Sequence, residues 1–195
     1  MKKQGIFVFI LVLGFLYLIA GTEPDPRVLI RTDFGDIKIE ISARQAPVTS
    51  ANFLRYVDVG LFKGASFYRV VRLDNQPNNA VKIEVIQGGL EFSEDKKPFP
   101  PIPHETTDKT GILHKDGTIS MARLAPGSAD SEFFICVGDQ PELDFGGKRN
   151  PDGQGFAAFG RVIEGQDVVQ KIQQQPDEGQ ILKQRVSIKD IERCK

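Results

Sequence analysis

Short stretches in which apolar and polar residues alternate recur after residue 27 and predict β-strands. Residues 37–41 show this pattern. Residues 28–32 also predict a strand, and Gly35 between the two favours a tight turn, so together they predict a hairpin. Residues 66–71 are rich in aromatic and β-branched residues, and they predict an otherwise apolar strand that one arginine interrupts. Further strands are expected at residues 82–86, 156–162 and 185–191.

Apolar residues recur at helical spacing in two places. A helix is expected to open near Pro47, with Thr49 or Ser50 as its cap and Gly60 at its end. Its apolar stripe consists of Ala51, Phe53, Leu54 and Val57. A shorter helix is expected at residues 165–174, with an apolar face of Val168, Val169 and Ile172. Many short strands with two short helices predict a mainly β fold, a closed antiparallel barrel whose ends the helices plug.

Two long polar loops are expected, at residues 72–82 and 93–111, the second with four prolines. Loops of this kind around a β scaffold often form a rim. His104 and His114 lie in loop-like sequence without a partner motif, so we expect both to be solvated and predict no metal site.

Residues 1–21 are typical of a targeting segment. Two lysines precede an apolar run over residues 5–20, which is shorter than the ~20 residues of a spanning helix and suits a long signal peptide. Cleavage after Ala20 is plausible, although Leu18 is a poor match for a small residue, so a signal peptide and an uncleaved membrane anchor both remain open. Either way we expect an exported domain in the periplasm or another extracytoplasmic space. Residues 22–27 predict a short linker.

Charge and cysteine content narrow the function classes. The formal charge is −1, and two of the lysines lie within residues 1–21, so the remainder carries about −3, which does not favour nucleic acid. Cys136, at the end of an apolar strand, is most simply a small core residue, and the sequence leaves a disulfide with Cys194 open.

Arg69 is the arginine inside the strand predicted at residues 66–71. A guanidinium among aromatic side chains is costly to bury unless its donors are used. It is either an edge residue paired with a surface carboxylate or a functional group.

Six segments, taken in order along the chain, settle this choice by resemblance. Residues 67–71 (Phe-Tyr-Arg-Val-Val) resemble the Phe-His-Arg-Val-Ile strand of the cyclophilins, and residues 87–89 match their Gln-Gly-Gly. Residues 119–122 (Ile-Ser-Met-Ala) resemble Leu-Ser-Met-Ala, and residues 131–135 (Ser-Glu-Phe-Phe-Ile) resemble Ser-Gln-Phe-Phe-Ile. Leu-Asp at 143–144 and Phe-Gly at 159–160 follow. The resemblance runs from about Val28 to Lys195.

The resemblance implies an eight-stranded barrel over residues 28–195 that acts as a peptidyl-prolyl cis-trans isomerase, with Arg69 as the catalytic residue. Phe134, Leu143 and Val85 are expected to line a proline pocket, and Gln87 to bind substrate backbone or orient Arg69. The full implied substrate-binding set is Tyr68, Val85, Gln87, Met121, Ala122, Arg123, Leu124, Glu132, Phe134, Leu143 and Phe156. The expected partners are proline-containing polypeptides, with no cofactor, metal or nucleic acid, membrane contact only through residues 1–21, and a monomeric state.

Several positions depart from the family pattern. Tyr68 and Phe156 stand where histidines are common, and Glu132 replaces a glutamine, where it could pair with Arg69. Glu84 is expected at a pocket position where phenylalanine is common. Glu142 stands where well-known eukaryotic members have tryptophan, so we expect weak cyclosporin binding. Three acids near one arginine also motivate an alternative function, a barrel that binds proline-containing segments as a chaperone or scaffold with little turnover.

Overall fold

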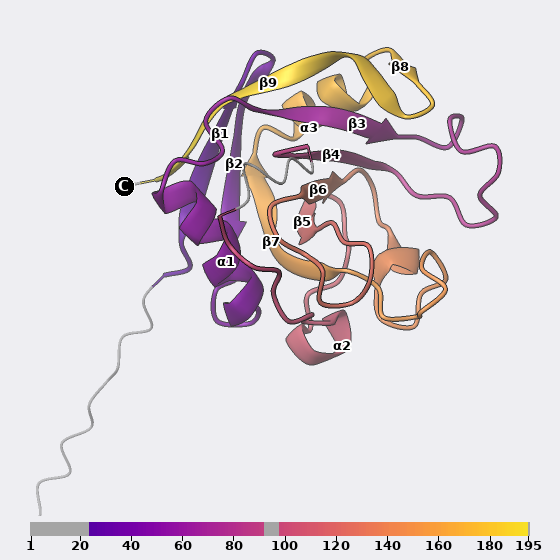
Figure 1. Cartoon of the computed structure of the whole chain (residues 1–195). Coiled ribbons are helices and arrows are strands. Elements are labelled where there is room, and N and C mark those ends of the chain that lie inside the picture. The colour runs from indigo at the N-terminus through magenta and orange to yellow at the C-terminus, as the bar shows by residue number, and fades with distance from the viewer. Residues whose placement is uncertain (1–23, 92–97, 195) are drawn as a thin grey trace, which may run out of the picture.

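The computed structural model describes residues 24–91 and 98–194 (Figure 1). The predicted signal peptide or anchor at residues 1–21, and the first two residues of the predicted linker, lie outside the described residues. The described strands are β1 (Arg27–Thr32), β2 (Gly35–Ile41), β3 (Ala65–Val71), β4 (Val85–Gly89), β5 (Thr118–Met121), β6 (Phe133–Cys136), β7 (Ala157–Glu164), β8 (Asp177–Glu178) and β9 (Ile181–Arg193). The described helices are α1 (Pro47–Asp58), α2 (Thr107–Thr110), the 3-10 turn η2 (Pro141–Leu143) and α3 (Gln166–Gln173).

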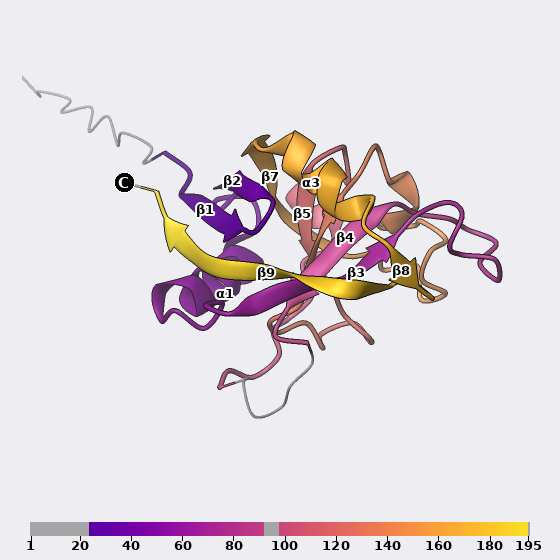
Figure 2. The ribbon, with the colours of Figure 1, turned by 90° about the horizontal axis from the view of Figure 1, so that it is seen from above.

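Eight strands close into an antiparallel barrel. They follow the order β1-β2-β7-β5-β6-β4-β3-β9, and pairing of β9 with β1 closes the ring. The two-residue β8 pairs with β9 outside this ring. The helices α1 and α3 lie on opposite sides of the barrel, where they cover its two ends (Figures 1 and 2). The predicted barrel with two helical plugs is therefore confirmed, and α2 adds a short helix that the pattern did not indicate.

The barrel core is aromatic at the end that α1 covers. Phe53 of α1 packs edge-on against Phe133 of β6, with ring centroids 5.5 Å apart, and lies 5.1 Å from the ring of Phe159 of β7. All three side chains are fully buried. Burial of each such side chain stabilises the fold by about 1.5–3 kcal/mol. The opposite end is filled by the apolar face of α3, which confirms the predicted stripe.

The start of α1 differs from the prediction. The Thr49 and Ser50 hydroxyls are buried without a hydrogen-bond partner among the described residues. The carboxylate of Glu105, in the long loop before α2, instead accepts the backbone N–H groups of Val48 (3.2 Å) and Thr49 (2.7 Å). A side chain distant in sequence thus caps the helix, because it supplies acceptors to donors that the helix itself cannot satisfy.

Strand β4 begins at Val85, whereas the pattern predicted a strand from residue 82. The side-chain amide of Gln76 accounts for the difference, since it donates to the carbonyl of Ile83 (2.7 Å) and accepts its N–H (3.3 Å). The N–H of Glu84 donates to the side chain of Gln140 (3.1 Å). Side chains therefore replace the strand ladder at residues 83 and 84.

Neither of the two cysteines forms a disulfide, and Cys136 is fully buried in β6. Within residues 24–91 and 98–194, no helix has the length and apolar character that crossing a membrane requires.

Candidate active site

A cavity of about 390 Å³ opens on the outer face of the barrel wall formed by β3, β4 and β6. We call it the Arg69 cavity. Its lining residues are Tyr68, Arg69, Ile83, Val85, Gln87, Ala122, Arg123, Leu124, Phe134, Leu143, Phe156 and Ile181. Arg69 and nine of the eleven residues predicted to bind substrate thus line the same cavity.

A bulge in β3 brings Tyr68 and Arg69 to the same side. The register of β3 against both β4 and β9 shifts between Phe67 and Arg69. Phe67 is fully buried in the barrel core, while its two successors both line the cavity. A regular strand would send neighbouring side chains to opposite faces, so the extra residue of the bulge is what re-aims one of them.

The floor of the cavity is an apolar cluster separate from the barrel core. It comprises Val71, Ile83, Val85, Phe134, Cys136 and Leu143, with Ala122 and Phe156 packed against it. The rings of Phe134 and Phe156 meet edge-to-face with centroids 5.2 Å apart. Such a surface suits a small apolar ring more than a charged side chain.

Arg69 is held by two neutral amides. Its Nη1 donates to Oε1 of Gln87 (2.6 Å), and its Nε (3.1 Å) and Nη2 (2.6 Å) both donate to Oε1 of Gln180. No carboxylate of a described residue forms an ion pair with it. Burial lowers the pKa of Arg69 from its ordinary value, yet an arginine remains charged at neutral pH. The guanidinium is therefore oriented without being neutralised.

Glu132 is linked to Arg69 indirectly, through Tyr68 and Gln87. Its carboxylate accepts hydrogen bonds from the Tyr68 hydroxyl (2.8 Å) and from the backbone N–H of Leu90 (2.9 Å). The Tyr68 hydroxyl in turn accepts from Nε2 of Gln87 (2.6 Å), which fixes the Gln87 amide with its oxygen toward Arg69. Burial and the nearby charge of Glu132 raise the pKa of Tyr68. The ion pair that the sequence suggested between Glu132 and Arg69 is thus replaced by a relay through Tyr68 and Gln87.

His114 is buried, so the expectation that it is solvated was wrong. Its Nδ1 lies 2.7 Å from Oδ1 of Asp144, its Nε2 lies 2.9 Å from Oγ of Ser120, and its ring stacks on Phe134 at 5.9 Å. Ser120 is fully buried, so this Ser-His-Asp chain has no access to a substrate and supports the cavity wall instead. His104 is partly buried, with its Nε2 3.1 Å from the carbonyl of Gln154.

Arg123 forms one edge of the cavity in a fixed position. Its guanidinium bonds the carbonyl of Gly155 and the carboxylate of Asp152 (2.8 and 2.9 Å), and its side chain is only 1% exposed. The hydrogen bonds from Arg123 lower the pKa of Asp152 to about 2. Beside this pair, Leu124 is 83% exposed and available for contact with a bound chain.

Four residues lie elsewhere than the sequence suggested. Met121 and Glu132 do not line the cavity, and Met121 packs in the barrel core. Ile83 takes the lining position expected for Glu84, whose carboxylate instead accepts from Gln173 (3.4 Å). The carboxylate of Glu142 accepts the N–H of Lys148 (2.8 Å).

Sequence reasoning missed Gln180, which bonds Arg69 from the turn between β8 and β9, and Ile181, the first residue of β9, which lines the cavity. No motif marks this turn, and only closure of the barrel brings it beside β3.

The fold and the Arg69 cavity define a closed β-barrel with an external, apolar site for a peptide. Residues 27–193 match the family model for the cyclophilin type peptidyl-prolyl cis-trans isomerase/CLD. A peptidyl-prolyl cis-trans isomerase of Acinetobacter baylyi is 35% identical over 168 residues, which cover 85% of this chain and 81% of that protein. Peptidyl-prolyl cis-trans isomerase B of Escherichia coli is 37% identical over 147 residues, covering 74% of this chain and 82% of that protein.

Solved structures agree on the fold. A crystal structure of a cyclophilin-type isomerase from Cryptosporidium parvum superposes with a TM-score of 0.67 at 23% identity, covering 88% of this chain and 98% of that one. Another crystal structure of it, obtained in the presence of the dipeptide Ala-Pro, gives a TM-score of 0.67 at 24% identity and covers 85% and 97%. The chain belongs to the cyclophilin-type peptidyl-prolyl cis-trans isomerase family and is a prolyl isomerase.

Proposed function

We propose that Arg69 is the catalytic residue and that the Arg69 cavity holds the proline ring of an X-Pro segment. Rotation about the peptide bond before proline is opposed by a barrier of about 18–20 kcal/mol, which arises from amide resonance. As the bond twists, the lone pair of the prolyl nitrogen localises and can accept a hydrogen bond. A charged donor placed there stabilises the twisted state more than either planar state, so it lowers the barrier without a covalent step.

The orientation of Arg69 carries this proposal. Gln87 and Gln180 take up three of the five N–H groups of the guanidinium, which leaves one on each terminal nitrogen for a substrate. The apolar floor, with Phe134 and Leu143, would receive the proline ring, and residues 122–124 would form the edge along which the peptide backbone lies. Tyr68, Val85 and Phe156 complete the walls.

Comparing binding with turnover tests these roles in the full-length protein. We expect Arg69→Ala to abolish acceleration of X-Pro exchange while a proline-containing peptide still binds. Loss of both acceleration and peptide binding would instead indicate that Arg69 has a structural role. The chaperone or scaffold alternative was motivated by acids beside Arg69, and Glu84, Glu132 and Glu142 form no ion pair with it in the described part of the chain. Binding without acceleration in the wild-type protein would support that alternative.

The proposed substrates are exposed X-Pro bonds in unfolded or flexible proteins outside the cytoplasm, where the enzyme would assist folding. The apolar run at residues 5–20 after two lysines supports export. Cell fractionation and sequencing of the mature N-terminus test this proposal. A chain that starts near residue 22 indicates cleavage, an intact membrane-bound chain indicates an anchor, and an intact cytoplasmic chain contradicts export. We further propose a monomer, which light scattering after size-exclusion chromatography tests.

A further inference from the structure

Gln180 reaches Arg69 from a segment that carries none of the family-like motifs. Its single side-chain oxygen accepts two of the three hydrogen bonds that Arg69 donates, from Nε (3.1 Å) and Nη2 (2.6 Å). Gln87 accepts the third on the opposite side of the guanidinium, from Nη1 (2.6 Å). The plane of the guanidinium is therefore set by two amides, one from the barrel wall and one from the turn between β8 and β9.

The backbone of Gln180 is fixed beside the strand that carries Arg69. Its carbonyl accepts the N–H of Val70 (2.8 Å), and its own N–H donates to Oδ2 of Asp177 (2.9 Å). Its φ angle is +78°, a left-handed conformation that residues other than glycine seldom adopt. Local structure alone does not favour this conformation, so the surrounding contacts must hold it.

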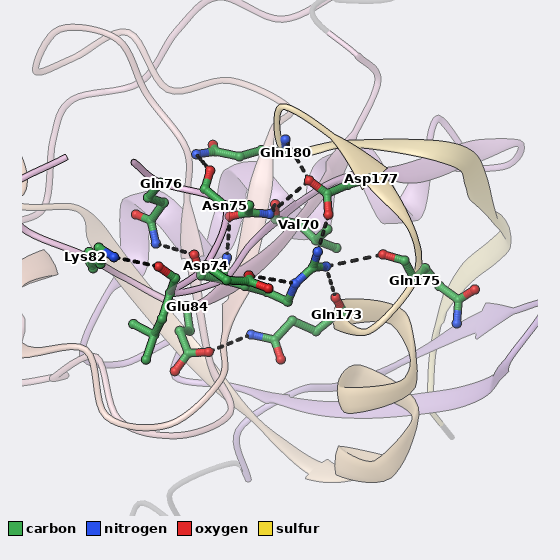
Figure 3. Close-up of polar contacts among 12 residues, drawn as sticks. Val70, Asp74, Asn75, Gln76, Lys82, Glu84, Gln173, Gln175, Asp177 and Gln180 are labelled. Atoms are coloured by element: carbon green, nitrogen blue, oxygen red, sulfur yellow. Dashed lines mark hydrogen bonds and ion pairs between the residues drawn. The ribbon is translucent and has the colours of Figure 1, made fainter. Parts of the chain in front are cut away.

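Those contacts come from the loop between β3 and β4, which lies alongside the β8–β9 turn (Figures 1 and 2). Nδ2 of Asn75 in this loop donates to Oδ2 of Asp177 in β8 at 3.0 Å. The side-chain N–H₂ of Gln180 donates to the backbone carbonyl of Asn75 at 3.1 Å (Figure 3). The guanidinium of Arg72 bonds the carboxylate of Asp177 and also the carbonyl of Gln173 (2.7 Å). The Asp177 side chain is only 7% exposed. Loop and turn are thus joined into one polar cluster directly behind Gln180.

Both acceptors that hold Arg69 are neutral amides, and their neutrality affects the charge that the guanidinium presents to a substrate. A carboxylate at residue 180 would orient the guanidinium equally well, but it would offset the positive charge that the prolyl nitrogen needs as the bond twists. An amide orients the group and leaves its charge intact. Orientation matters because a displacement of about 1 Å in a reacting group can reduce the rate by about 100-fold.

We propose that Gln180 is a positioning residue for Arg69 and that the cluster of Arg72, Asn75 and Asp177 holds Gln180 in its left-handed conformation. This inference rests on the proposed role of Arg69 in catalysis. The loop at residues 72–82 would thus affect catalysis through Gln180, although no residue of this loop lines the cavity.

The variant Gln180→Gly separates the side chain from the backbone. Glycine adopts a φ of +78° without strain, so the turn is retained while the amide is lost. We expect kcat for an X-Pro peptide, measured by NMR line exchange, to fall about tenfold with KM changed less than about twofold. Gln180→Glu should also lower kcat, since it keeps the acceptor but adds a negative charge. The matched control is Glu178→Gln, an exposed position at the end of β8 next to the turn, which should behave as wild type.

A double-mutant cycle distinguishes positioning from a general structural role. If Gln180 acts through the guanidinium of Arg69, Gln180→Gly should cause little further loss in an Arg69→Lys background, whose residual activity can still be measured. An equal tenfold loss in that background, or wild-type kcat in the single variant, would overturn the inference. Should Gln180→Gly fail to fold, Gln180→Asn replaces it, because asparagine tolerates the left-handed region and its shorter side chain should reproduce the loss.

Failure of this inference differs from failure of the proposed function. If Arg69→Ala loses activity and Gln180→Gly keeps it, only the role of Gln180 is rejected. If Arg69→Ala keeps wild-type activity, the proposed role of Arg69 is rejected, and the positioning role is rejected with it.

Discussion

The hydroxyl of Tyr68 donates a hydrogen bond to the buried carboxylate of Glu132 at 2.8 Å, and this contact keeps the acid apart from Arg69. A glutamate in place of the usual glutamine could have neutralised the guanidinium. Tyr68, in place of the usual histidine, supplies a donor for that carboxylate and an acceptor for Gln87. The two departures from the family pattern therefore compensate each other.

The variant Tyr68→Phe tests this compensation. It removes one hydrogen-bond partner from Glu132 and one from Gln87, both buried, so we expect a loss of about 1–3 kcal/mol in the free energy of unfolding. We also expect a severalfold lower kcat, because Gln87 loses its fixed orientation. Urea unfolding and NMR exchange measure the two effects.

Tyr56→Phe is the matched control, since the Tyr56 hydroxyl is buried without a hydrogen-bond partner among the described residues. Its removal should leave stability unchanged or slightly raised. Equal stability and activity in Tyr68→Phe and wild type would show that the relay from Glu132 has no role.

Glu105 should stabilise the fold through helix α1. Glu105→Ala removes the acceptor of two N–H groups in the first turn, and we expect a cost of about 1 kcal/mol in the free energy of unfolding. Activity per folded molecule should not change, because none of the residues that line the Arg69 cavity belongs to α1. Urea unfolding beside the exposed variant Glu178→Ala checks this, and an unchanged unfolding midpoint would argue against the cap.

Asp152 should contribute an acid-sensitive part of the stability. Its pKa is about 2 in the folded protein, because of Arg123, against about 3.9 in an unfolded chain. The unfolded state therefore binds the proton more readily, so this stabilisation is complete above pH ~4 and is lost as the pH falls toward ~2. Unfolding curves of wild type and Asp152→Asn should converge over that window. Parallel curves would mean that the ion pair adds nothing.

Cyclosporin should bind weakly, because Glu142 stands where well-known eukaryotic relatives have tryptophan and its carboxylate is directed to the N–H of Lys148. We expect a Kd above about 1 μM by calorimetry. Glu142→Trp should tighten binding. A sub-micromolar Kd for the wild-type protein would contradict this expectation.

The sequence was sufficient for the barrel and for most of the cavity, because strand alternation and the ordered motifs place Arg69, Gln87 and Phe134 on adjoining strands. Alternation also explains one error. Met121 follows Ile119 by two residues in β5, so both side chains point into the core, opposite Ser120. The family motif contained Met121, but the strand period should have excluded it from the cavity.

The remaining features depend on tertiary contacts that no local pattern encodes. The bulge that turns both Tyr68 and Arg69 outward is defined only by pairing with β4 and β9. His114 is polar and lies in a loop, and it is buried only because Asp144 and Ser120 satisfy both ring nitrogens. Gln180 is 111 residues from Arg69 in sequence, and barrel closure alone brings them together.

The most direct test of the account is NMR line exchange on a short X-Pro peptide with full-length wild type, Arg69→Ala and Arg69→Lys. Wild type should accelerate exchange strongly, and Arg69→Ala should not. Arg69→Lys should recover only a small part, because an ammonium keeps the charge but cannot span Gln87 and Gln180. Acceleration that survives in a folded Arg69→Ala variant would contradict the central claim that this guanidinium lowers the barrier.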